Sequence, residues 1–133
     1  MSRILAVDYG SKRTGLAISD PLNQYAIPLE IIESTRTYPH IKQLLLNENI
    51  QTVVIGLAVP MSGRPNQQVT STINIANRIR NLGVEVVFED EHLTSEAALQ
   101  IQHGQPSLNK TFLDDIAASV ILQQYINSKK TDL

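Results

Sequence analysis

The segment from Thr52 to Ala58 limits the possible fold more than any other part of the chain. It is an unbroken run of apolar and β-branched residues, Thr-Val-Val-Ile-Gly-Leu-Ala. A strand with one face in water alternates polar and apolar residues, so an unbroken run is typical of a central parallel strand covered on both faces. We therefore expect an α/β domain with helices on both sides of its sheet.

The rest of the chain supplies partners for this strand. Strands are expected at residues 3–8, 14–20, 26–32 and 84–88, and Pro28 places the third of them at an edge of the sheet. One helix is expected to open at residue 37, and others to span residues 67–82, 94–103 and 112–127. This order predicts a mixed sheet in which the first, fourth and fifth strands run parallel.

Acidic residues stand at the ends of two of these parallel strands. Asp8 ends the first strand, and Asp90 and Glu91 follow the fifth. Because ligands bind beyond the carboxyl ends of parallel strands, these acids should share one edge of the sheet. If the fourth strand lies between them, their strand ends start about 10 Å apart.

Asp114 is the third acidic point. It shares a helical face with the small residues Ala117 and Ala118, so that face should pack closely on the sheet and aim Asp114 at the same edge. Hard oxygen ligands without cysteine indicate Mg²⁺ or Mn²⁺, and two such ions about 4 Å apart can cleave a phosphodiester. The alternative for Asp114, and for Asp115 beside it, is a favourable charge at a helix N-terminus.

Four segments of the chain resemble the YqgF/RuvX family of the ribonuclease H-like superfamily, and they occur in the family's order. They span residues 5–15, 54–63, 90–95 and 114–123. The resemblance implies a five-stranded sheet of order 3-2-1-4-5 with strand 2 antiparallel. It also implies a nuclease for the 5′ end of 16S ribosomal RNA, or a Holliday junction resolvase, with Asp8, Glu91 (or Asp90) and Asp114 as metal-binding and catalytic acids.

The chain departs from the family's pattern at two places. An Asn and an acid that usually stand in the loop after the fourth strand are missing from residues 58–63. His92 replaces an Arg, which removes a permanent cation that could hold a phosphate by two hydrogen bonds. These changes affect the expected contacts to substrate phosphates more than the expected metal ligands.

Four cations are candidates for contacts to nucleic-acid phosphates. Lys12 and Arg13 follow Asp8 in a turn. Arg64 and Lys110 lie in expected loops on either side of the expected cleft at the acidic edge of the sheet. A solvated turn is the alternative for the first pair. The formal net charge of -2 argues against a simple electrostatic clamp, although setting aside the five acids at the three points leaves eight acids against eleven bases.

Three functions are compatible with these patterns. The first is an endonuclease acting on structured RNA such as pre-rRNA, with branched DNA as the variant substrate. The second is a nucleotide-dependent phosphotransferase, because Asp-x-Gly-Ser after a first strand resembles the phosphate loop of actin-like ATPases, although the second domain of those proteins is lacking. The third is a non-catalytic binder of RNA, ribosomal particles or assembly factors.

Length and composition set the remaining expectations. The chain has 133 residues and no cysteine, which favours one domain over residues 1–127 with a flexible tail at 128–133 and excludes thiolate metal sites. No apolar run approaches the ~20 residues of a membrane span, so a cytoplasmic protein without a membrane partner is expected. The pattern leaves the oligomeric state open.

Overall fold

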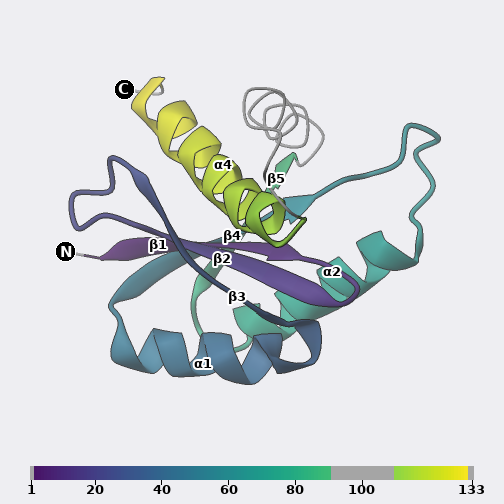
Figure 1. Ribbon diagram of the computed structural model, residues 1–133, viewed down its shortest axis with the longest axis horizontal. Coiled ribbons are helices and arrows are strands. Elements are labelled where there is room, and N and C mark those ends of the chain that lie inside the picture. The colour runs from purple at the N-terminus through teal and green to yellow at the C-terminus, as the bar shows by residue number, and fades with distance from the viewer. Residues whose placement is uncertain (1, 91–109, 132–133) are drawn as a thin grey trace.

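The computed structural model describes residues 2–90 and 110–131, which form a five-stranded sheet with helices on both faces (Figure 1). The strands are β1 (Arg3–Tyr9), β2 (Arg13–Ser19), β3 (Ala26–Glu33), β4 (Ile50–Leu57) and β5 (Glu85–Asp90). The helices are η1 (Ser34–Arg36), α1 (Thr37–Asn47), α2 (Gln67–Arg80) and α4 (Lys110–Thr131).

The strand order β3-β2-β1-β4-β5 confirms the predicted topology. β4 runs parallel to both β1 and β5, whereas β2 is antiparallel to β1 and β3. Pro28 lies in the edge strand β3, where a missing N–H does not interrupt the sheet. The carboxyl ends of β1, β4 and β5 therefore meet at one side of the sheet, which we call the carboxyl edge.

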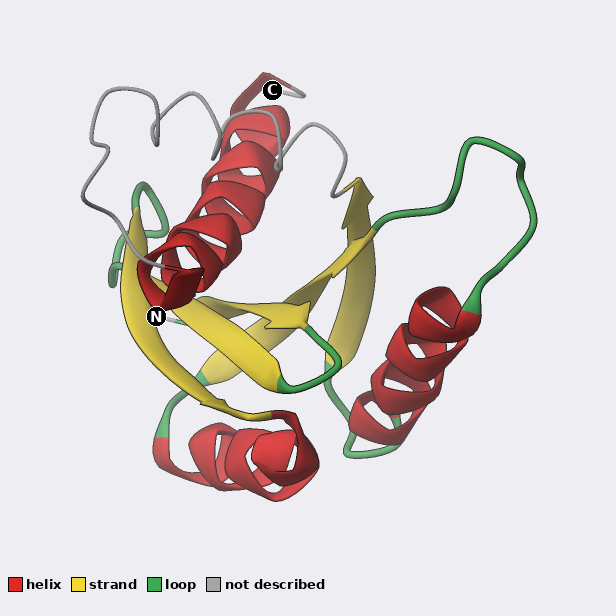
Figure 2. Ribbon diagram, turned by 45° about the vertical axis from the view of Figure 1, so that its right-hand side comes forward, coloured by secondary structure: helices red, strands yellow, loops and turns green. Residues whose placement is uncertain are grey.

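Each face of the sheet is covered by its own helices: α4 on one side, α1 and α2 on the other (Figure 2). Side chains alternate along a strand, so Ile4 and Ala6 of β1 pack towards α4, and Leu5 and Val7 pack towards α1 and α2. In β4, Val53, Val54 and Ile55 are fully buried. This confirms that β4 is a central strand covered on both faces.

Element boundaries differ from expectation mainly at α4. The helix continues to Thr131, so residues 128–131 are helical rather than part of a loose tail. α2 ends at Arg80, two residues early, and Gly83 beyond it has a left-handed φ of 95°. The helix expected at 94–103 lies outside the described residues. No helix in the described segments is long and apolar enough to cross a membrane.

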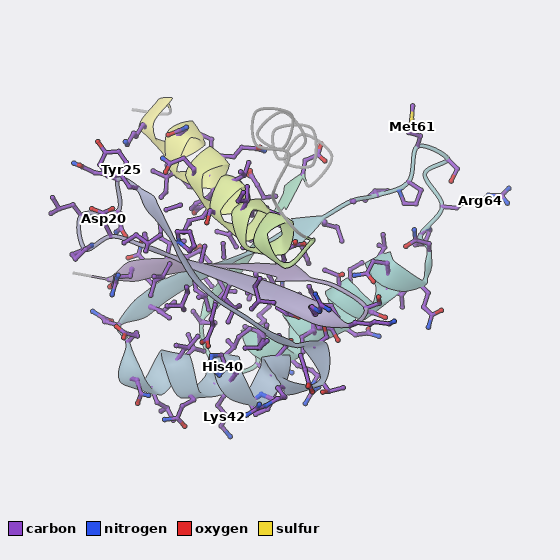
Figure 3. All side chains as sticks on the ribbon, in the orientation of Figure 1. Asp20, Tyr25, His40, Lys42, Met61 and Arg64 are labelled. Carbon is purple, nitrogen blue, oxygen red and sulfur yellow. The ribbon has the colours of Figure 1, made fainter. Side chains whose placement is uncertain are left out.

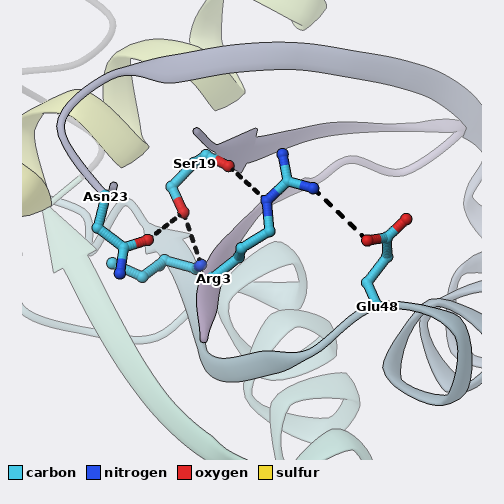
Figure 4. A network of polar contacts seen from close by, with 5 residues as sticks. Arg3, Ser19, Asn23 and Glu48 are labelled. Carbon is cyan, nitrogen blue, oxygen red and sulfur yellow. Dashed lines mark hydrogen bonds and ion pairs between the residues drawn. The ribbon is translucent and has the colours of Figure 1, made fainter. Parts of the chain in front are cut away.

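The opposite end of the sheet, where β1 begins, is held by a network of polar contacts (Figure 4). The Arg3 Nε–H donates to the Ser19 carbonyl at 2.8 Å, and the Ser19 hydroxyl donates to Asn23 Oδ1 at 2.6 Å. Arg3 also lies 3.5 Å from the carboxylate of Glu48 beyond α1. These contacts join β1 to β2 and to the end of α1, which is a structural role.

Candidate active site

Asp8 lies in β1, one residue before the strand ends, and its side chain is half-buried. Strand alternation places it on the α4 face of the sheet, the face of Ile4 and Ala6. On β2, its paired residue is Gly15. On β4, Val7 pairs with Ile55, so the residue beside Asp8 is the next one, Gly56. Neither neighbour has a side chain, so no side chain of β2 or β4 stands level with Asp8 on this face.

The same row of residues continues into β5. Gly56 pairs with Glu89, and Gln124 of α4 donates to Glu89 Oε2 at 3.5 Å, which places the Glu89 carboxylate on the α4 face. Two strand spacings separate the backbones of Asp8 and Glu89, about 10 Å. We call Gly15, Asp8, Gly56 and Glu89 the acidic row.

The environment of Glu89 favours its neutral form more than water would. Burial is the main cause that raises the pKa of this carboxyl, and the negative charge of Asp90 adds to it, while the hydrogen bond from Gln124 opposes both. A carboxylate in such a place gains from a nearby cation. The sequence analysis did not single out Glu89. Glu89 lies two residues after the apolar Val87, and side chains two apart in a strand point to the same face of the sheet. Val87 packs against the α4 cluster, so this spacing was a usable signal.

Asp90 points to the other face of the sheet. It pairs with Leu57 and follows Phe88, which packs with the cluster under α1 and α2. It lines a cavity of ≈310 Å³ together with Leu57, Val59, Phe88 and Glu89. The sheet therefore brings Asp8 and Glu89, rather than Asp8 and Asp90, onto one face.

The N-terminal end of α4 lies towards the carboxyl edge (Figure 1). Tyr125 and Ile126, near the other end of the helix, line a cavity with Ile4 and Glu85, where β1 and β5 begin. The helix therefore runs roughly against the parallel strands. This direction places the backbone of residues 114 and 115, in the second turn of the helix, at the end nearer the carboxyl edge.

Some predicted site residues lie outside the described part of the chain. Glu91 and His92 lie outside the described residues, and so do the side chains of Lys110, Asp114 and Asp115. Lys110 itself is the first residue of α4 rather than a loop residue. Within the described residues, no three acidic or histidine side chains form a group that could hold a metal ion.

A family model described as "RuvX: Holliday junction resolvase" matches residues 2–128. The chain belongs to the RuvX family. Two relatives named "Putative pre-16S rRNA nuclease" are each 34% identical to it. The one from Flavobacterium psychrophilum aligns with 97% of this chain and 99% of its own length, and the one from Sulfurihydrogenibium sp. with 96% and 91%.

The fold is also that of a solved structure, Thermus thermophilus RuvC in complex with a Holliday junction substrate. The TM-score is 0.63 at 14% identity, and the match covers 98% of this chain and 96% of that one. At this identity the likeness shows the fold alone. It is a ribonuclease H-like sheet, as the resemblance implied.

In this RuvX-family chain, the turn that carries Lys12 and Arg13 is tight. The Gly10 N–H donates to the Arg13 carbonyl at 3.0 Å, and a Cβ on Gly10 would stand only 2.5 Å from that oxygen. Only glycine fits such an approach. The turn therefore holds both exposed cations at the carboxyl edge, directly after Asp8.

The loop between β4 and α2 lacks the Asn and the acid that are usual in the family. It projects away from the sheet (Figure 3). Met61 in this loop is fully exposed, and Arg64 is exposed and lies far out on the same loop. Lys12 and Arg13 thus lie at the turn that follows the strand of Asp8, whereas Arg64 lies far out on its loop.

Proposed function

We propose that this protein is a metal-dependent endonuclease that cleaves a phosphodiester bond in structured RNA, specifically at the 5′ end of pre-16S ribosomal RNA. The observation that carries the proposal is the acidic row, in which Asp8 stands between two glycines. This row lies on the α4 face of the sheet, at the carboxyl edge. We expect the protein to act in the cytoplasm on ribosomal particles or their precursors.

The donors of the acidic row fit Mg²⁺ or Mn²⁺. Asp8 and Glu89 offer only hard carboxylate oxygens, which are the donors that Mg²⁺ prefers, and neither Gly15 nor Gly56 adds a side chain to this row. Asp8 would hold the metal, with Glu91 and Asp114 as the further ligands that the family pattern implies. Two bound ions would activate a water and stabilise the leaving oxygen.

The chain's own cations would position the substrate. Lys12 is exposed in the turn after Asp8, where its ammonium can contact a phosphate of the strand that crosses the carboxyl edge. Arg13 lies in the same turn and adds a second positive charge. These contacts would orient the scissile phosphate towards Asp8 without reading its sequence.

Cleavage of matched RNA and DNA substrates tests the proposal. Wild-type protein is incubated with a pre-16S RNA fragment that keeps its 5′ extension, or with a four-way DNA junction, in Mg²⁺ or in Mn²⁺. We expect metal-dependent cleavage of the RNA, and Asp8→Asn should slow it by at least about 100-fold, because a metal ligand is lost. Asp20→Asn, at the opposite end of the sheet, is the control and should cleave like wild type.

Three results would overturn the proposal in different ways. Cleavage that survives Asp8→Asn would remove the assigned mechanism. Cleavage of the junction but not of the RNA would make the protein a resolvase, which is the function that the family description favours. Metal-independent RNA binding with no cleavage at stoichiometric protein would make it a binder.

A further inference from the structure

A second cavity opens at the carboxyl edge, on the face opposite to the acidic row. It has a volume of ≈410 Å³ and lies between the β1–β2 turn and the first turns of α2. Its walls are Tyr9, Gly10 and Ser11 from the turn, and Gln67, Gln68 and Ser71 from the helix. The volume lies within the range of small-ligand pockets.

One wall of this cavity is fixed by hydrogen bonds. Gln68 Nε2 donates to the Tyr9 carbonyl at 2.6 Å, and the Thr72 hydroxyl donates to the Gln68 carbonyl at 2.8 Å. Tyr9 is half-buried against the core cluster under α1 and α2. The turn that carries Tyr9 and the first turn of α2 are thus held together before any ligand enters.

The other polar groups of the cavity have no such bonds. The side chains of Ser11, Gln67 and Ser71 make no hydrogen bond to any described residue, and Ser11 and Gln67 are exposed. Together they offer two hydroxyls and one carboxamide. A carboxamide presents a donor and an acceptor side by side, which matches the edge of a nucleobase.

Among the described residues, no charged side chain lines the cavity, although Lys12 stands in the same turn. A phosphate would favour a cationic site, whereas a flat, uncharged ring with hydrogen-bonding edges suits an aromatic, amide-lined one. The cation beside the cavity is placed for the phosphate that flanks such a ring. Charge therefore selects a base inside the cavity and a phosphate outside it.

We propose that this cavity binds one unpaired nucleobase of the substrate strand, with Tyr9 as its aromatic wall and Gln67 reading the base edge. The inference rests on the proposed function and deepens it. Because Tyr9 follows Asp8 directly in β1 and faces the other way, a base held here would fix the strand that crosses the carboxyl edge towards the acidic row. Unpaired bases that stack and pair with side chains are the usual basis of sequence-specific RNA recognition.

Binding in the presence of EDTA tests the cavity separately from cleavage. Fluorescence anisotropy compares a labelled short single-stranded RNA with an abasic ribose-phosphate chain of the same length. Wild type should prefer the RNA by about tenfold, the contribution of one well-held base. Gln67→Ala should lose most of that preference, while affinity for the abasic chain stays the same.

Gln43→Ala is the matched control, because Gln43 is also an exposed glutamine on a helix, on α1, far along the chain from the cavity. It should keep the wild-type preference. Circular dichroism establishes that both variants fold, and Ser71→Ala provides a second, smaller change in the same wall. A preference that survives both Gln67→Ala and Ser71→Ala, or equal binding of RNA and abasic chain by wild type, would overturn the proposal.

A single-stranded DNA of the same sequence distinguishes the two possible sources of the base. If RNA binds more strongly than DNA and this difference depends on Gln67, the cavity binds a base of an RNA strand. If DNA binds as strongly as RNA or more strongly, the cavity binds a base of a DNA strand. Because cleavage plays no part in these measurements, a protein that fails to cut RNA could still show the base preference. Conversely, an active nuclease could lack it, so the two proposals fail separately.

Discussion

The carboxylate of Asp20 organises the turn after β2 by accepting backbone hydrogen bonds. Its Oδ1 accepts from the N–H groups of Gln24 and Tyr25, both at 2.7 Å. The bond from Tyr25 is the main cause that lowers the pKa of Asp20 below its ordinary value of 3.8, and burial opposes it. The stabilisation is therefore fully present above pH 3.8 and is lost as the pH falls through the lower pKa of the folded state.

Asp20→Asn provides the test at this residue. Asparagine keeps an oxygen acceptor for the turn but does not titrate, so the variant should lose less stability than wild type between pH 4 and pH 2.5. Urea midpoints measured across this range give the comparison. Parallel curves for the two proteins would show that the turn carboxylate does not contribute to acid unfolding.

The positions of Glu89 and Asp90 on opposite faces lead to a second prediction for single residues. Glu89→Gln should weaken Mn²⁺ binding by about tenfold, because it removes a charge from the face that carries Asp8. Asp90→Asn should stay close to wild type. Electron paramagnetic resonance of unbound Mn²⁺ measures both affinities, and a larger effect at Asp90 would refute the assignment of faces to the metal.

At the scale of elements, the start of α2 depends on one side chain. Asn66 Oδ1 accepts from the Val69 N–H at 2.8 Å, which caps the helix that carries Gln67 and Gln68. Asn66→Ala should cost about 1 kcal/mol of unfolding free energy. Asn81→Ala at the other end of α2 is the matched control, because its side chain makes no hydrogen bond to the described residues. Urea denaturation of both variants checks this, and equal losses would contradict the cap.

The order and type of these elements could be predicted because each one carries a local signal. The unbroken apolar run of β4 indicated a strand buried on both faces, and Pro28 indicated an edge. The end of α4 had no comparable signal. Ser128 and Lys129 are polar but do not break a helix, and the packing of Tyr125 and Ile126 on the sheet supports the helix beyond Asn127.

The candidate site was only partly predictable, because its composition depends on register. Asp8 could be found from its place at the end of a strand, and Gly56 from its place in β4. The pairing of Asp8 with Gly15, and of Gly56 with Glu89, depends on how separate strands align, and no local pattern contains that. A shift of one residue in β5 would have placed Asp90 in the acidic row.

At the scale of the whole molecule, charge makes metal and nucleic-acid binding depend on each other. The chain has a formal net charge of -2, and Asp8 and Glu89 share the edge on which Lys12 is exposed. Without a cation, these carboxylates repel the phosphates that Lys12 and Arg13 attract. RNA binding should therefore be weaker in EDTA than in Ca²⁺, which occupies hard oxygen sites.

The same argument predicts that a variant lacking one acid binds RNA more tightly when no metal is present. In EDTA at low salt, Asp8→Asn should bind a short RNA several-fold more tightly than wild type. A like charge about 10 Å from a phosphate at an effective dielectric of 20 is worth about 1–2 kcal/mol. Ca²⁺ should then add less affinity to Asp8→Asn than to wild type, because part of the repulsion is already gone. Asp20→Asn removes the same charge from the opposite end of the sheet and should leave both affinities unchanged. If it matches Asp8→Asn, net charge rather than the acidic row governs binding.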